Sequence, residues 1–482
     1  MIFNKFYFLS FLFLLVASVT QANEKIIFKL NDNQKVESSF SADIDQESSI
    51  HLLVFKDNAL SKFGIKPFYI DEYEEVNELE IIYFKKAPKI VSFHLAKEDG
   101  ILSLLTTPQK SKGKSLDIFD FNVVSGDVIK DSMYFNDEYI TVRLPEKTIL
   151  ISNEEDNNKL KITTVNNSRD AYDVTYSFEG ENLKFYKAIF QSNPDVININ
   201  EFVENGSVKR SKLYIQDDHL IFDYKTDDSY KVMSLSHRFE EEPICHEIKI
   251  EGLENVKDVG TYIFDHNSFL FINTKEDIHL WSYDTESGEN LMKENLNLKL
   301  KELVTEQSLE NLIKKSKRGR FALTGTVNAT SNQDMLVTID YVDTRDYQYN
   351  YNWWFHHWFM QQQMMMQMQQ QQMINQMNRQ LNTMNSFGGP HPGSEDLTYN
   401  SVKPMITVED NSIHFMIDRN FEIKSTNEGV PIRKKIYKEK IIDKLNTMPR
   451  IKHSSIAFTQ NSARYIYFSK KDDCFLMNIE TY

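Results

Sequence analysis

The residues with the clearest potential for chemistry lie in a tract rich in tryptophan, histidine, methionine and glutamine. His356, His357, Met360, Met364 and Met368 offer imidazole nitrogens and thioether sulfurs, and the three methionines are four residues apart. Residues four apart on a helix are neighbours, and thioethers and imidazoles suit Cu(I). The spacing predicts a soft-metal site for copper; no other cofactor is indicated.

The same tract has an apolar stripe. Its 41 residues from Tyr347 to Phe387 contain one charge, Arg379, in a chain that is 26% charged. Gln and Met favour helix, and at about 100° per residue several large apolar side chains share one helix face. Methionine-rich surfaces adapt to partners, and aromatic residues dominate interface hot spots. The residues expected to bind a partner or a second copy are Trp353, Trp354, Phe355, Trp358, Phe359, Met366, Met373 and Met377. A second interpretation is a low-complexity insertion whose stripe packs on its own domain.

Short strands and polar turns surround this tract. Segments of about 4–7 residues such as Ile90 to Leu95 and Phe269 to Ile272 are rich in β-branched and aromatic residues, as expected of half-buried strands. An aspartate recurs at or near the end of such a strand, at intervals of 49 to 61 residues and one of 78: Asp71, Asp120, Asp173, Asp223, Asp284, Asp340 and Asp418. These intervals are near the ~40–50 residues of a propeller blade.

The repeat predicts an all-β protein, a β-propeller of seven or eight blades with a helical low-complexity insertion. Phe119 to Lys130 and Ile278 to Met292 resemble, in architecture, the strand–turn–strand units of tryptophan–aspartate and quinoprotein-type repeats. The glycine–histidine and tryptophan–aspartate signatures are absent, so no family follows from the resemblance. Two packed β-domains are the alternative fold. A further helix is expected between Lys299 and Lys317.

The first residues have the pattern of a secretory signal. Lys5 precedes an apolar run from Phe6 to Val19, and Thr20-Gln21-Ala22 forms a small-x-small cleavage site. The run is shorter than the ~20 residues of a membrane span. We therefore expect an exported protein, periplasmic or extracellular, without a transmembrane segment after signal removal. The expected organisation is 1–22 signal peptide, 23–345 first blades, 346–397 insertion and 398–482 closing blades.

Charge and cysteine content narrow the partners. The formal net charge of -15 disfavours nucleic acid. The chain has only two cysteines, too few for a disulfide scaffold. Cys474 lies in an apolar segment and is expected as a buried free thiol.

Common catalytic motifs are absent from the sequence. It has no Gly-x-Ser-x-Gly elbow, Walker loop, dinucleotide fingerprint or His-Glu-x-x-His helix. The function we expect is therefore that of a binding or scaffold protein that engages a protein or glycan. The alternatives are a hydrolase or lyase with its site in the propeller channel, and copper handling through the insertion.

Overall fold

The structure is a computed structural model. The residues that it describes are 25–45, 47–107, 115–135, 139–154, 158–191, 193–197, 199, 203, 206–303, 306–330, 332–344, 412–425, 445, 448, 451–459 and 462–481. No described helix is long and apolar enough to cross a membrane.

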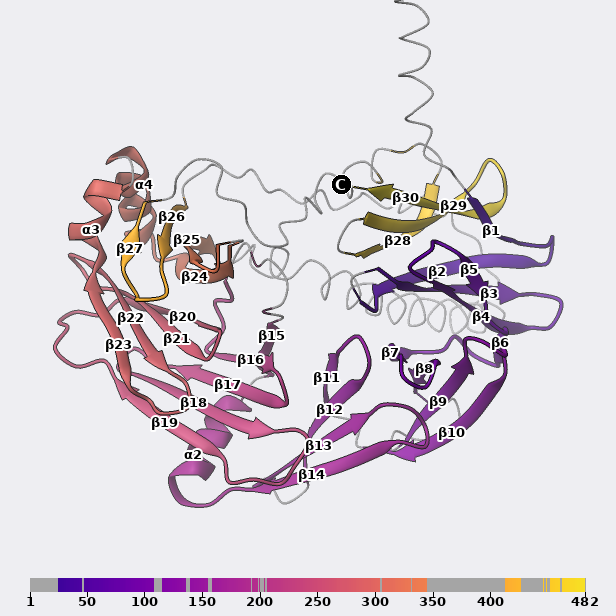
Figure 1. The fold of residues 1–482 in the computed structure, drawn as a ribbon, viewed down its shortest axis with the longest axis horizontal. Coiled ribbons are helices and arrows are strands. Elements are labelled where there is room, and N and C mark those ends of the chain that lie inside the picture. Colours follow the sequence, from indigo (N-terminus) through magenta and orange to yellow (C-terminus); the bar gives the residue numbers. More distant parts are fainter. Residues whose placement is uncertain are drawn as a thin grey trace, which may run out of the picture.

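The described strands form seven sheets of four or five strands, arranged around a common centre in an incomplete ring (Figure 1). Each sheet is one blade of a seven-bladed β-propeller, which confirms the fold predicted from the sequence. Blade 1 consists of β2 (Gln34–Asp43), β3 (Ser49–Asp57), β4 (Lys62–Ile70), β5 (Val76–Glu78) and β6 (Ile82–Phe84). Blade 2 consists of β7 (Ile90–Ala96), β8 (Ile101–Thr106), β9 (Ser115–Asn122) and β10 (Val128–Tyr134). Blade 3 consists of β11 (Tyr139–Arg143), β12 (Thr148–Asn153), β13 (Lys159–Val165) and β14 (Ala171–Ser177).

Blades 4 to 6 follow the same order, and blade 4 has an extra strand, β15, parallel to β16. Blade 4 consists of β15 (Asp195–Ile197), β16 (Ser211–Gln216), β17 (His219–Lys225), β18 (Ser229–Ser236) and β19 (Ile244–Lys249). Blade 5 consists of β20 (Asp258–Phe264), β21 (Asn267–Asn273), β22 (Ile278–Asp284) and β23 (Asn290–Asn295). Blade 6 consists of β24 (Phe321–Ala329), β25 (Met335–Asp343), β26 (Ile413–Ile417) and β27 (Ile423–Lys424).

Blade 7 joins the two ends of the described chain. It consists of β28 (Ile451–Phe458), β29 (Ser462–Ser469) and β30 (Cys474–Thr481), with β1 (Lys25–Lys29) antiparallel to β30. Lys25 pairs with Met477 and Lys29 with Cys474 in this register. Blade 7 is therefore completed by hydrogen bonds between strands from opposite ends of the described chain. Cys474 is buried and, like Cys245, is not in a disulfide, as predicted for Cys474.

Apolar residues between facing sheets form the cores. Between blades 3 and 4, for example, Ile149 and Ile162 lie in one cluster with Leu213 and Phe222. A sheet in a propeller is covered on both faces, which explains why second strands such as β29 are buried along their whole length.

The aspartate repeat only partly follows the blades. Asp71, Asp284 and Asp418 each end the third strand of a blade or directly follow it, and each accepts backbone N–H bonds in the turn to the fourth strand. Asp173 lies in a fourth strand instead, and Asp340 in a second strand, in the same blade as Asp418. The aspartate series therefore predicted the correct fold, although its members do not occupy the same position in successive blades.

Three helices are described. The helix expected between Lys299 and Lys317 is two helices, α3 (Leu296–Leu303) and α4 (Glu306–Ser316), which link blades 5 and 6. The third, α2 (Gly180–Ile189), links blades 3 and 4 and was not predicted.

Residues 344–412 connect β25 to β26, which are neighbouring strands of blade 6. Ile339 pairs with Ile413, so the connection leaves and re-enters the blade on the same side. The segment 346–397 that the sequence singled out lies within the connection and outside the described residues.

Candidate functional site

The described helices all lie on one face of the propeller. Within each blade the second strand runs toward the turn that leads to the third strand, and the fourth strand ends on that same side. α2 follows β14, a fourth strand, and α3 follows β23, another fourth strand. The connection 344–412 follows β25, a second strand, so it leaves from this side too. We call this side, which carries the three helices and the 344–412 connection, the helix face.

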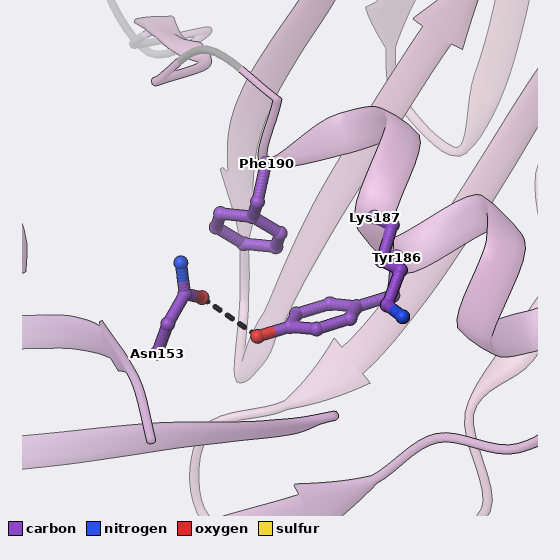
Figure 2. A pocket seen from close by; sticks show the side chains of 4 residues that line it. All are labelled: Asn153, Tyr186, Lys187 and Phe190. Atoms are coloured by element: carbon purple, nitrogen blue, oxygen red, sulfur yellow. Dashed lines mark hydrogen bonds between the residues drawn. The ribbon is translucent and has the colours of Figure 1, made fainter. Parts of the chain in front are cut away.

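A hollow of about 280 Å³ lies on the helix face, between α2 and the end of β12. Asn153, Tyr186, Lys187 and Phe190 line it (Figure 2). α2 buries Phe185, Tyr186 and Ile189, whose spacing places them on one side of the helix. Phe190 follows the helix, and its N–H donates to the Tyr186 carbonyl. The end of α2 thereby sets two walls of the hollow.

Aromatic packing fixes these walls. The Tyr186 ring stacks on Phe178, with centroids 4.5 Å apart and ring planes 14° apart. The Phe190 ring lies 5.1 Å from Tyr186 and 5.3 Å from Phe222, a strand residue of blade 4. Such pairs stabilise by about 0.5–1.5 kcal/mol beyond burial. The floor of the hollow is therefore part of the core between blades 3 and 4.

A hydrogen bond orients the opposite wall. The Tyr186 hydroxyl lies 2.7 Å from Asn153 Oδ1, to which it donates, and 3.1 Å from the Lys159 carbonyl (Figure 2). Burial raises the pKa of Tyr186 to about 12, so the phenol stays protonated and keeps donating at neutral pH. This bond fixes the direction of the Asn153 amide.

The four described lining residues offer groups that can stack and form hydrogen bonds. They provide two aromatic rings, one amide and one ammonium group, and none of these four residues is a carboxylate, imidazole or thiol. The hollow can hold a ligand by stacking and hydrogen bonds.

Buried histidines lie elsewhere, within and between blades. His51 hydrogen-bonds Ser41 at 2.6 Å and Ser49 at 3.0 Å, and His94 hydrogen-bonds Thr148 at 2.9 Å and the Asn166 carbonyl at 2.8 Å. Burial lowers the pKa of His51 to about 3 and that of His94 to about 4. Both rings are thus neutral, with both nitrogens engaged, which fits a structural role.

A second cluster of buried polar side chains lies between blades 4 and 5. Lys212 and Asp223, both fully buried, have Nζ and Oδ2 3.5 Å apart, and Thr261 donates to Asp223 at 2.8 Å. Lys225 donates to the Val259 carbonyl, and burial lowers its pKa to about 8. These residues link the blades and lie outside the hollow. The described residues contain no group of three or more His, Cys, Asp or Glu that could hold a metal ion.

The residues that the sequence proposed as sites all fall in the 344–412 connection. The proposed metal ligands (His356, His357, Met360, Met364 and Met368) and the proposed interaction residues (Trp353, Trp354, Phe355, Trp358, Phe359, Met366, Met373 and Met377) lie outside the described residues. They stay predictions.

Sequence reasoning missed the hollow. The spacing of Phe185, Tyr186, Ile189 and Phe190 was the available signal for α2. No local sequence pattern predicts that Asn153 lines the hollow. Its position there depends on the fold, which brings the end of β12 beside Tyr186, 33 residues further along the chain.

No protein-family model and no curated protein matches this sequence. Among solved structures, the chain is similar to a prolyl endopeptidase (8% identity, 64% of this chain and 46% of the other, TM-score 0.24). It is also similar to the β-propeller domain of the Trilobed protease from Pyrococcus furiosus (7% identity, 64% and 91%, TM-score 0.23). A third is an apocarotenoid oxygenase from Synechocystis (8% identity, 55% and 63%, TM-score 0.28). The chain spans less than two thirds of the endopeptidase and of the oxygenase. TM-scores this low carry no information on activity.

Proposed function

We propose that the protein is a binding scaffold whose helix face engages a protein or glycan. The observation that carries the proposal is topological: the hollow beside α2 and both ends of the 344–412 connection are on the same side of the ring. Loops on a rigid scaffold are where binding residues concentrate. The interaction residues proposed from the sequence, such as Trp353 and Trp358, belong to a connection that begins and ends on the same side of the ring as the hollow.

The turns on the opposite side are short by comparison. Those of blades 1 and 2, for example, are Asp71 to Glu75 and Asn122 to Asp127, each closed by its own backbone and side-chain hydrogen bonds. They have exposed apolar tips, Tyr73 and Val124, which are 77% and 90% exposed. These tips supply a matched control surface for a test.

The test compares three forms of the full chain on an array of immobilised glycans and, for a second copy of the chain, by sedimentation velocity. The forms are wild type, Trp353→Ala/Trp354→Ala/Trp358→Ala, and Tyr73→Ala/Val124→Ala. We expect the tryptophan variant to lose binding or self-association by at least tenfold, and the control to match wild type. Loss in the control alone, or in neither variant, would overturn the proposal, as would turnover of a bound glycan.

The two other functions stay expectations from the sequence. A channel hydrolase or lyase and copper handling through His356, His357 and the methionines each have a distinct readout. They are product release in the array assay and a stoichiometric Cu(I) titration. Export to the periplasm or the extracellular space is likewise part of this proposal and would supply a compartment rich in glycans.

A further inference from the structure

A short basic turn joins α4 to β24 on the helix face. Its four residues, 317–320, are all exposed, and we call them the basic tip. A Cβ at Gly319 would meet nothing within 4 Å, so the space around the tip is open. Two backbone hydrogen bonds of 3.0 Å hold the turn: the Arg318 N–H donates to the Lys315 carbonyl, and the Phe321 N–H donates to the Arg318 carbonyl. Exposed tips with so few bonds are preferred sites of proteolysis.

Two cations of the tip have side chains that the fold does not use. The neighbouring cations each pair with a carboxylate: Lys314 with Glu310 at 3.2 Å, Lys315 with Asp340 at 2.9 Å and Arg320 with Asp343 at 3.3 Å. Within the part of the chain that the structure describes, the side chains of Lys317 and Arg318 have no hydrogen-bond or ion-pair partner. A protease with carboxylates in its substrate groove can therefore bind this Lys–Arg pair without first breaking an ion pair of either residue.

The sequence contains one other Lys–Arg pair, Lys209-Arg210, and the fold protects it. The Arg210 carbonyl accepts the N–H of Lys225 at 2.9 Å. The next residue, Ser211, is buried and begins β16. A protease must hold the residues on both sides of the bond that it cuts, and here they belong to a sheet. At the basic tip the corresponding residue is Gly319, which is exposed.

The basic tip also lies at the base of the 344–412 connection. The Arg320 carbonyl accepts both the N–H and the hydroxyl of Thr344, each at 3.0 Å. Thr344 is the residue at which the connection begins. A break between Arg318 and Gly319 places this anchor one residue from a new chain end, where the backbone opens more readily.

We propose that the peptide bond between Arg318 and Gly319 is a processing site for a serine endoprotease that recognises paired basic residues. Hydrolysis breaks this bond, and one water supplies the hydroxyl of the new Arg318 carboxyl group and a proton for the new Gly319 amine. The two products stay assembled, because residues on both sides of the cut share the core of blades 4 to 6 and β1 remains paired with β30. The cut loosens the anchor of the 344–412 connection; its effect on binding rests on the proposed function, whereas the site itself does not.

The test incubates the full chain with a purified serine endoprotease specific for Lys-Arg and Arg-Arg sites, followed by denaturing electrophoresis and N-terminal sequencing. We expect a product that begins at Gly319 and a cut protein that elutes as wild type does in size-exclusion chromatography. Arg318→Gln should slow this cut at least tenfold, and the matched control Arg210→Gln should leave its rate unchanged. Synthetic peptides 312–322 and 205–215 should be cut at comparable rates, because both contain the Lys–Arg pair without the fold.

The proposal is overturned if the folded chain is not cut before Gly319 while peptide 312–322 is, if Arg210 is cut as fast as Arg318, or if the only cut lies elsewhere, such as after Arg433. Amide hydrogen exchange at Thr344 should be faster in the cut form, and equal exchange would refute the loosened anchor. Cleavage is measured without any ligand, so a failure of the proposed binding function on the glycan array is seen separately from a failure of the processing site.

Discussion

Lys212 and Asp223 pair across neighbouring strands of blade 4, and neither side chain is exposed to solvent. Their charged atoms lie 3.5 Å apart, and Lys212 also donates to Thr261 of blade 5. Burial lowers the pKa of Lys212 and raises that of Asp223, so desolvation opposes the charges that their attraction favours. The pair links two blades at a cost in desolvation.

Lys212→Met should therefore destabilise the protein by about 3–5 kcal/mol, because it leaves the Asp223 carboxylate buried without its cation. Urea unfolding followed by circular dichroism measures the change. The double variant Lys212→Met/Asp223→Leu should recover most of the loss. Lys209→Met removes a partly exposed lysine that pairs with Asp195, and should cost only about 0.2–1 kcal/mol. Equal costs for the two lysines would contradict this account.

Stability should fall as the pH drops from 7.5 to 5, owing to His51 and His94. Their pKa values in the folded protein, about 3 and about 4, are below the ~6.5 of an unfolded histidine. The unfolded state therefore binds protons first, and stability present above pH 6.5 is lost as the pH falls toward the folded values. Each histidine should contribute about 2 kcal/mol of this loss by pH 5. Unfolding curves of wild type and His94→Gln at both pH values check this: the variant should show the smaller difference, and an unchanged difference would refute the assignment.

Gly325→Ala should destabilise the protein by about 1–3 kcal/mol through overpacking. A Cβ at this position of β24 would lie 2.1 Å from the Phe271 ring, which is fully buried. Gly319→Ala is the matched control, because a Cβ there meets nothing within 4 Å. The difference in thermal midpoint between the two variants measures the effect. A Gly325 variant as stable as the Gly319 variant would show that β24 shifts freely.

Fold class was predictable because strand composition is a local property. The segment from Ile90 to Leu95, for example, has a composition typical of a strand, and the observed strand β7 spans Ile90–Ala96. Glycine is scarce, with 15 of 482 residues, and this scarcity has a structural counterpart. Residues other than glycine adopt positive φ at many turns, among them Asp217, Asn255 and Asp265. These types tolerate the left-handed region better than most.

The register of the repeat and the hollow were less accessible. Asp284 and Asp340 look alike in sequence, yet one caps a turn and the other pairs with Lys315 of α4. Whether an aspartate caps a turn or pairs with a lysine depends on neighbours that are distant in sequence. The hollow likewise needs Asn153 and Phe190 from different elements, and no local pattern links them.

The pairing of β1 with β30 has a consequence for how the molecule forms. In six blades the strands follow one another along the chain, but the seventh needs partners about 450 residues apart. Contacts between distant residues form late because they require the largest loop to close. We therefore expect an intermediate with its blades formed and the ring open at blade 7, in which the free edge of β30 is a template for pairing with another chain. Assembly speed and resistance to aggregation would then both depend on the five residues of β1.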